Sequence, residues 1–320
     1  MNKFIFCLLI LLLPTAFLYG QCSDAGVCSF HSNDEGIFRR SGIGAQYLNG
    51  YSGKEDDIIY ETAKLSGYYW FSRELNLGVV IPASRQRGKL GTVQGLGDVI
   101  VVLDYLVNDH PGDLTLAGET SLIKGTFEKT SIQIGSKFAS GAVNTKGLPL
   151  RYQSGLGTND LLLGAIYTAA HARKYDYDLF EGGLTLQIPF GTAGNSIDSL
   201  ERGIDLLGRI GYQYPILQSF GIKGEMLAIK RLTKSTLHNS IILTEDGSPD
   251  PVGIIGSYQV DDNTLQINLT ASATYNIQQD IFFETGFAIA LLHKKLNYDG
   301  LNRSYTLFAS ANYHFRLLLH

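Results

Sequence analysis

Charged residues are scarce in this chain, and neither sign dominates. Only 18% of the 320 residues are charged, and 26 Lys+Arg against 30 Asp+Glu give a formal net charge of -4. So few charges beside 44% hydrophobic residues argue against intrinsic disorder. The slight acidic excess argues against nucleic-acid binding, which requires a basic surface. A mean hydropathy of +0.03 is too low for a bundle of membrane helices.

Long apolar runs are also lacking beyond the first twenty residues. Met1-Asn2-Lys3 gives a short positive start, and an unbroken apolar run follows over 4–13. This layout predicts a signal peptide over 1–20 and a separate polar segment over 21–40. A lipoprotein is the alternative because Cys22 follows the expected cut, but Gln21 stands where lipid attachment favours a small residue. No later stretch approaches the roughly 18 residues of a spanning helix.

Cysteine is rare, with three in the chain, one of them inside the predicted signal peptide. Cys22 and Cys28 remain after export, and an even count in an oxidising compartment predicts a small disulfide loop. A metal or redox pair is the alternative. No neighbouring His or Cys residues complete a zinc site, and the spacing of the two cysteines is not Cys-x-x-Cys, so we predict no metal site.

Residues alternate between apolar and polar through most of the remaining chain. In 264–275 the apolar Leu265, Ile267 and Leu269 alternate with polar neighbours, and the last segment, 305–315, repeats the pattern with aromatic residues near its ends. Successive side chains of a strand point to opposite faces, so such segments form a sheet with one apolar and one polar surface. Aromatic residues at both ends of the apolar face are typical of a lipid-facing strand.

Twelve such segments and their connections predict an all-β transmembrane antiparallel barrel over 41–315, with a tail over 316–320. Short turns alternate with long polar connections, as in outer-membrane barrels. Only edge-free barrels or helices satisfy every backbone group in hydrocarbon. Residues 113–127 fit no hairpin and leave fourteen strands as the alternative; a secreted β-sandwich or soluble barrel is the competing fold. The expected strands are 41–51, 60–71, 75–84, 97–107, 130–139, 159–170, 177–190, 203–214, 219–230, 264–275, 281–293 and 305–315.

The polar faces of these strands would line the barrel interior. They form either an ion-paired filling that rigidifies the barrel or a polar path for a solute. Residues 21–40 are long enough to enter the lumen as a plug, or else lie in the periplasm. The candidate lumen-lining residues are Lys64, Asp98, Asp104, Lys137, Asp160, Asp205, Arg209, Gln213, Lys223, Glu225 and Glu284.

Catalytic motifs are absent from the sequence. It contains no Gly-x-x-x-x-Gly-Lys-Ser/Thr phosphate loop, no His-Glu-x-x-His and no Gly-x-Ser-x-Gly. His293 near a strand end is the one candidate base for a membrane-embedded hydrolase, and no partner for it can be named. We therefore predict no catalytic residue and no cofactor.

Two glycine-containing segments each open a predicted strand. Gly95-Leu96-Gly97-Asp98 and Gly155-Leu156-Gly157-Thr158-Asn159-Asp160 both place an acidic residue after paired glycines, which permit a bend at a barrel rim. This pattern resembles the bacterial outer-membrane family named for the MetA pathway of phenol degradation. The chain departs from the family where strands end, because Ile81-Pro82-Ala83 and residues 188–191 match the family's pattern there only in part. The resemblance implies a barrel that transports small molecules.

From these observations we expect an exported outer-membrane barrel that passes or binds small, hydrophobic or aromatic molecules. Its expected partners are outer-membrane lipid, the barrel-assembly machinery and a small solute, and no nucleic acid. The alternatives are a structural or adhesive barrel acting through its loops, especially 231–263, and a membrane-embedded hydrolase.

Overall fold

The computed structural model describes residues 41–53, 57–110, 126–172, 177–195, 199–238, 257–260, 265–278, 280–292 and 303–315. The predicted signal peptide, the segment 21–40 with Cys22 and Cys28, and the tail 316–320 lie outside the described residues, as does His293. Among the described residues, no helix is long and apolar enough to cross a bilayer.

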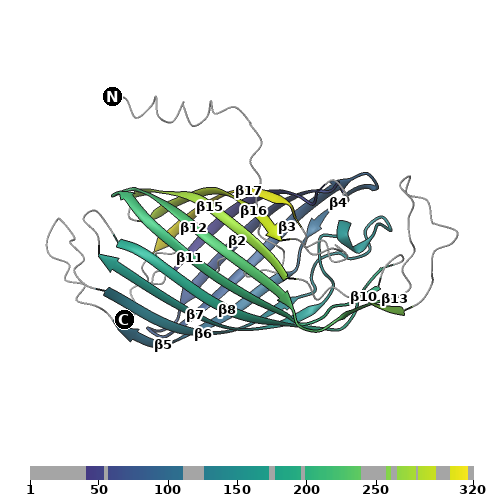
Figure 1. Cartoon of the computed structure of the whole chain (residues 1–320), viewed down its shortest axis with the longest axis horizontal. Helices are drawn as coiled ribbons and strands as arrows, with labels where there is room; N and C mark the ends of the chain where they lie inside the picture. Colours follow the sequence, from purple (N-terminus) through teal and green to yellow (C-terminus); the bar gives the residue numbers. More distant parts are fainter. Residues whose placement is uncertain are drawn as a thin grey trace, which may run out of the picture.

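Twelve antiparallel strands form a closed barrel, in which each strand pairs with its neighbours and β1 pairs with β17 to complete the ring (Figure 1). The predicted fold class is therefore confirmed. Ser41 lies opposite Phe315, so the first and last strands start and finish at the same end. The strands are β1 (Ser41–Tyr51), β2 (Ile59–Trp70), β3 (Leu75–Gly88), β5 (Val99–His110), β6 (Thr126–Phe138), β7 (Asn159–Ala172), β8 (Tyr177–Phe190), β11 (Asp205–Leu217), β12 (Phe220–Arg231), β15 (Leu265–Gln278), β16 (Ile281–Leu292) and β17 (Tyr305–Phe315).

The strand count settles the alternative raised by residues 113–127. Strand β5 pairs directly with β6, from Val99 opposite Phe138 to His110 opposite Glu128. Two additional strands between them would have separated this pair, so a fourteen-stranded barrel is wrong. Strand β6 also begins at Thr126, four residues before the expected start. There Phe127 is buried and Glu128 is exposed, the reverse of the apolar-out pattern on which the expected start was based.

Three connections expected to be loops contain short strands. Strand β3 runs on to Gly88 and returns as β4 (Gly91–Leu96), which lengthens the wall beyond the barrel at the long-loop end (Figure 1). The other two connections supply a separate four-stranded sheet, made of β9 (Ala193–Gly194), β10 (Ser199–Glu201), β13 (Ser235–His238) and β14 (Ser257–Val260). Pieces of two to four residues are too short for alternation to reveal.

The barrel is apolar outside and polar inside. Leu265 and Leu269 are exposed on the outer face of β15, whereas Gln266 and Asn268 between them are fully buried. Leu184, Ile210 and Ile222 are exposed in the same way on other strands. Exposed apolar surface this continuous is typical of a lipid-facing band. The alternation therefore sorts the residues as the sequence predicts, and the closed ring of strands shows that the secreted β-sandwich is wrong.

Exposed aromatic side chains gather toward one boundary of this band. Among the described residues, eight of the eleven exposed Tyr and Phe side chains lie toward the short-turn end of the barrel. Such girdles mark the level of the lipid–water interface. The eight are Phe71, Tyr105, Tyr167, Tyr212, Tyr214, Tyr275, Phe283 and Tyr313.

A charge in the middle of the outer face tests this orientation. Ile210 is half exposed and lies mid-strand on β11, so Ile210→Arg should lower the unfolding free energy by about 2–4 kcal/mol, the cost of arginine at the bilayer midplane. Leu217→Arg at the end of the same strand should cost about 0–1 kcal/mol because it lies near the interface. Urea unfolding in phospholipid vesicles measures both. Equal costs for the two variants would contradict a lipid-facing outer surface.

Candidate functional site

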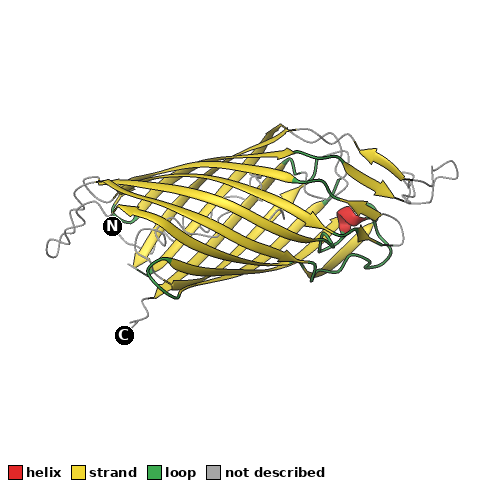
Figure 2. Cartoon of the chain, turned by 90° about the horizontal axis from the view of Figure 1, so that it is seen from below, coloured by secondary structure: helices red, strands yellow, loops and turns green. Residues whose placement is uncertain are grey.

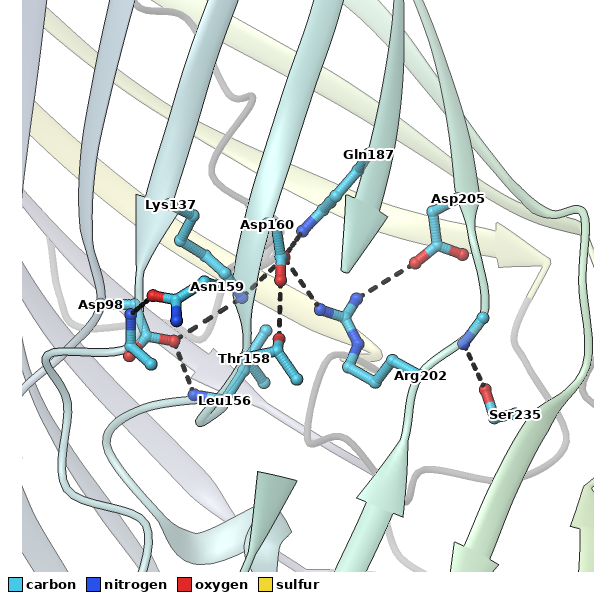
Figure 3. A network of polar contacts seen from close by, with 12 residues as sticks. Asp98, Lys137, Leu156, Thr158, Asn159, Asp160, Gln187, Arg202, Asp205 and Ser235 are labelled. Atoms are coloured by element: carbon cyan, nitrogen blue, oxygen red, sulfur yellow. Dashed lines mark hydrogen bonds and ion pairs between the residues drawn. The ribbon is translucent and has the colours of Figure 1, made fainter. Parts of the chain in front are cut away.

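Six buried charged side chains follow one another along the inner wall near the long-loop end. Figure 3 shows Asp98, Lys137, Asp160, Arg202 and Asp205 among them. Lys137 Nζ lies 3.6 Å from Asp98 Oδ2 and 2.8 Å from Asp160 Oδ2. Arg202 lies 3.3 Å from Asp160 and 3.1 Å from Asp205 through its two terminal nitrogens. Negative and positive groups alternate, so the set has no net charge. We call it the charge belt: Asp98, Lys137, Asp160, Arg202, Asp205 and Arg231.

Strand register places most of these groups side by side. Lys137 of β6 lies directly opposite Asp160 of β7, and Asp205 of β11 lies directly opposite Arg231 of β12. Directly paired residues of antiparallel strands point to the same face, so each pair meets on the interior side. Arg202 comes instead from the connection that precedes β11, and it joins the two pairs across β8.

Hydrogen bonds from further side chains hold several polar atoms of the belt. Thr158 Oγ1 donates to Asp160 Oδ1 at 2.7 Å, and Gln187 Nε2 donates to Asp160 Oδ2. Arg231 binds Asp205 through two nitrogens, Nε at 2.8 Å and Nη2 at 2.9 Å, and donates from Nη1 to Ser235 Oγ at 3.0 Å. Buried ions are tolerated only with such partners, so the belt is a fixed part of the wall.

The β6–β7 loop, residues 139–158, is held at the belt by Asp98. The Asp98 carboxylate accepts hydrogen bonds from Gly141 N at 3.0 Å and Leu156 N at 2.7 Å. A Cβ atom on Gly155 would lie 2.6 Å from Asp98 Oδ1 and 2.7 Å from Gly141 Cα, so this close approach requires glycine. The two motifs singled out in the sequence therefore meet in space, and Lys137 bridges their acidic residues, Asp98 and Asp160.

The same loop folds into the outer end of the barrel. Leu156 packs against the inward-facing Leu207, Leu227 and Ile229. The loop also contains a 3₁₀ turn, Leu150–Tyr152, which lies at the long-loop end (Figure 2). Tyr152 packs against Ile58, Tyr60 and Val93 on the β2–β4 side, and Leu150 packs against Ala193, Leu200 and Leu237 of the small sheet. The loop thus contacts widely separated parts of the rim and narrows the opening.

Three apolar patches of the described residues face the interior on the membrane side of the belt. The patch of Phe127, Ala170, Tyr177 and Leu179 lies at the short-turn end, and the other two lie next to the belt. One contains Ile100, Val102 and Leu162, with Val80 packed against them. The other contains Leu207, Leu227 and Ile229, with Leu156 from the β6–β7 loop. The patch with Leu207 borders a hollow whose lining is Gln133, Ile166, Gly183, Thr185, Leu207, Arg209 and Leu227. The interior therefore offers aliphatic as well as charged surface.

A second group of charges lies deeper in the barrel. Arg209 of β11 pairs with Glu181 of β8, and Lys223 Nζ lies 3.0 Å from Glu225 Oε2 on β12. Ser272 Oγ donates to Glu284 Oε1 at 2.6 Å. Along β11 and β12 this group and the belt lie on either side of the patch of Leu207, Leu227 and Ile229.

Four of the candidate lumen-lining residues, Asp98, Lys137, Asp160 and Asp205, come together in the belt, and Arg209, Lys223, Glu225 and Glu284 contribute to the deeper group. Asp205 and Arg209, four residues apart on β11, have different ion-pair partners. Asp104 is buried on β5, while Lys64 on β2 and Gln213 on β11 are partly buried.

Sequence reasoning missed Glu181, Gln187, Arg202 and Arg231. Glu181 and Gln187 occupy inward positions of an expected strand, so alternation alone would have found them. Arg202 and Arg231 fell in segments assigned to loops, and no sequence signal placed them in the interior. The described part of the chain holds no group of three or more His, Cys, Asp or Glu residues that could bind a metal ion.

Comparison with known proteins gives structural similarity without a family. No family model matches the chain, and no curated protein does. The NanC porin is 10% identical over 87% of this chain and 100% of its own, with a TM-score of 0.43. The KdgM porin is 9% identical over 85% and 99%, with a TM-score of 0.42. The TodX monoaromatic hydrocarbon channel is 8% identical over 87% and 90%, with a TM-score of 0.39. The family resemblance carried by 95–98 and 155–160 stays a prediction.

Proposed function

We propose that this chain is an outer-membrane barrel that passes or binds small solutes with an apolar, for example aromatic, part. The observation that carries the proposal is the aliphatic patch of Leu207, Leu227 and Ile229, which faces the interior between two groups of paired charges. A filling that only rigidified the barrel would need no aliphatic side chains beside a hollow. Apolar side chains there favour a solute that covers them, because contact removes both surfaces from water.

The placement in an outer membrane rests on the surface of the barrel and the layout of the chain. An apolar band surrounds the strands, and both ends of the barrel sequence lie at the short-turn end. In such barrels short turns face the periplasm and longer loops face outward. The apolar run over 4–13 is the expected export signal, and lipid and the barrel-assembly machinery are the expected partners.

The size of the barrel restricts the solute. Twelve strands enclose less space than the sixteen or more of an open porin, and the β6–β7 loop narrows the outer end further. We therefore infer a solute of the size of a single ring or a short chain. The charge belt would orient a polar group of this solute while its apolar part lies against Leu207 and Leu227.

Blockade of ion current tests the proposed path. In planar bilayers containing the full chain, benzoate should interrupt the single-channel current more strongly than acetate at equal concentration. Leu227→Ala should weaken the benzoate blockade about tenfold, the effect of losing roughly 50 Å² of apolar contact.

Leu184→Ala is the matched control for this experiment. Leu184 is exposed on the outer face of β8, so its truncation should leave the blockade unchanged. Equal blockade by benzoate and acetate in all variants would contradict an apolar recognition surface. Correctly inserted protein without any conductance or benzoate binding would overturn the proposal and favour a structural barrel.

A further inference from the structure

The outer face of β3 changes from apolar to basic along a single strand. Ile81 and Ala83 are exposed, as are Arg85 and Arg87 at the next outward positions and Lys89 in the turn that follows. Inward-facing Ser84 and Gln86 between them are buried. We call Arg85, Arg87 and Lys89 the basic stripe. It lies on the β3–β4 hairpin at the long-loop end (Figure 1).

The position of the stripe matches the edge of the lipid-facing band. From Leu75 to Ala83 the strand advances about 26 Å, which is about 20 Å along the membrane normal at the roughly 40° tilt typical of such barrels. Arg85 and Arg87 then lie about 25–30 Å from the level of Leu75, where an apolar band about 25 Å tall ends. The stripe therefore meets lipid headgroups in the outward-facing leaflet.

Neighbouring acidic groups leave the stripe with a positive excess. On the adjacent strand β2, Glu61 Oε2 lies 3.7 Å from Arg85 Nη1, and Glu61 Oε1 accepts a hydrogen bond from Tyr47 Oη. Asp57 accepts a hydrogen bond from Tyr51 Oη at 2.9 Å. From the other side Lys146 adds a further exposed cation, whose Nζ donates to Thr92 O of β4 at 2.8 Å. Among the described residues, these four cations outnumber the two carboxylates beside them.

We propose that the basic stripe binds a phosphate-bearing lipid headgroup of the outward-facing leaflet. Guanidinium groups bind phosphate through paired hydrogen bonds, and Arg85 and Arg87 present two such groups on one face, two residues apart. The adjoining apolar positions, Ile81 and Ala83, lie where the acyl chains of the same lipid would pass. The inference rests on the proposed membrane location and adds a lipid site outside the barrel.

Binding of bisphosphorylated lipid A to the full chain in neutral-lipid nanodiscs tests the inference. A cation at an anionic lipid surface contributes about fivefold in affinity, so R85Q/R87Q/K89Q should weaken binding by about 100-fold. The control R73Q/K230Q/K234Q removes three cations from other places and should change binding less than threefold. Native mass spectrometry of nanodiscs titrated with the lipid measures both.

Three results would overturn the inference. They are equal binding by the two triple variants, equal binding of lipid A without its phosphates, and full competition by millimolar inorganic phosphate, which would indicate a site for free anions. Insertion is measured in the same nanodiscs, and single-channel conductance is measured on the same purified protein in planar bilayers. Normal insertion and conductance with unchanged lipid binding in R85Q/R87Q/K89Q contradicts the lipid site alone. Failure of the unaltered chain to insert contradicts the proposed function instead.

Discussion

Replacing Asp98 with alanine is expected to raise the single-channel conductance severalfold. The Asp98 carboxylate accepts two backbone hydrogen bonds from the β6–β7 loop, at Gly141 and Leu156. Each hydrogen bond to a charged group contributes about 1.5–3 kcal/mol, so their loss should release the loop from the wall. Lys137 keeps its contact with Asp160 at 2.8 Å, and the belt should therefore stay folded. Planar-bilayer recordings measure the conductance.

A second variant distinguishes the effect of moving the β6–β7 loop from the effect of losing the Asp98 charge. Gly155→Val retains Asp98 but places new atoms where a Cβ would already lie 2.6 Å from the Asp98 carboxylate, so it should open the path to a similar degree. Gly67→Val is the control because nothing lies within 4 Å of its Cβ position. Unchanged conductance in folded Asp98→Ala and Gly155→Val would show that the β6–β7 loop does not restrict the path.

The wall of the barrel was predictable from the sequence because one local rule decides it. In β15 the alternation of Leu265, Gln266 and Ile267 assigns each side chain to lipid or interior without knowledge of any other strand. Strand ends were less certain where the alternation continues past the membrane, as in β3, which runs on to Gly88 to pair with β4. The small outer sheet was not predictable because its strands depend on pairing between distant connections.

The charge belt was predictable only in part. Alternation places Asp98, Lys137, Asp160 and Asp205 on the interior face, but it says nothing of which groups meet. Lys137 bridges two acidic residues because β6 is in register with β5 on one side and β7 on the other. Arg202 reaches Asp160 across 42 positions of sequence, from a segment that carries no inward-facing pattern. Such contacts follow from closure of the barrel and from loop folding.

The largest expected effect on stability comes from removing one charge from the neutral charge belt. Asp205 lies between two arginines, with Arg202 at 3.1 Å and Arg231 at 2.8 Å. Asp205→Ala leaves two buried cations without their shared carboxylate, and breaking such a buried set typically costs about 3–5 kcal/mol. Urea unfolding in vesicles, followed by the heat-modifiable shift in gel mobility, measures the loss. Glu201→Ala is the control, because that side chain is mostly exposed and should cost less than about 0.5 kcal/mol.

A double variant tests whether neutrality, rather than any single hydrogen bond, stabilises the belt. Asp205→Leu combined with Arg231→Met removes one charge of each sign and leaves Asp98, Lys137, Asp160 and Arg202 still alternating. Apolar replacements of a buried ion pair are often close to neutral in stability, so this chain should be more stable than Asp205→Ala. Suppose instead that the loss of unfolding free energy in the double variant equals the sum of the losses in Asp205→Leu and in Arg231→Met. Each contact then acts independently. The interior charges would then be separate pairs, and the belt would have no role as a unit in holding the β6–β7 loop over the path.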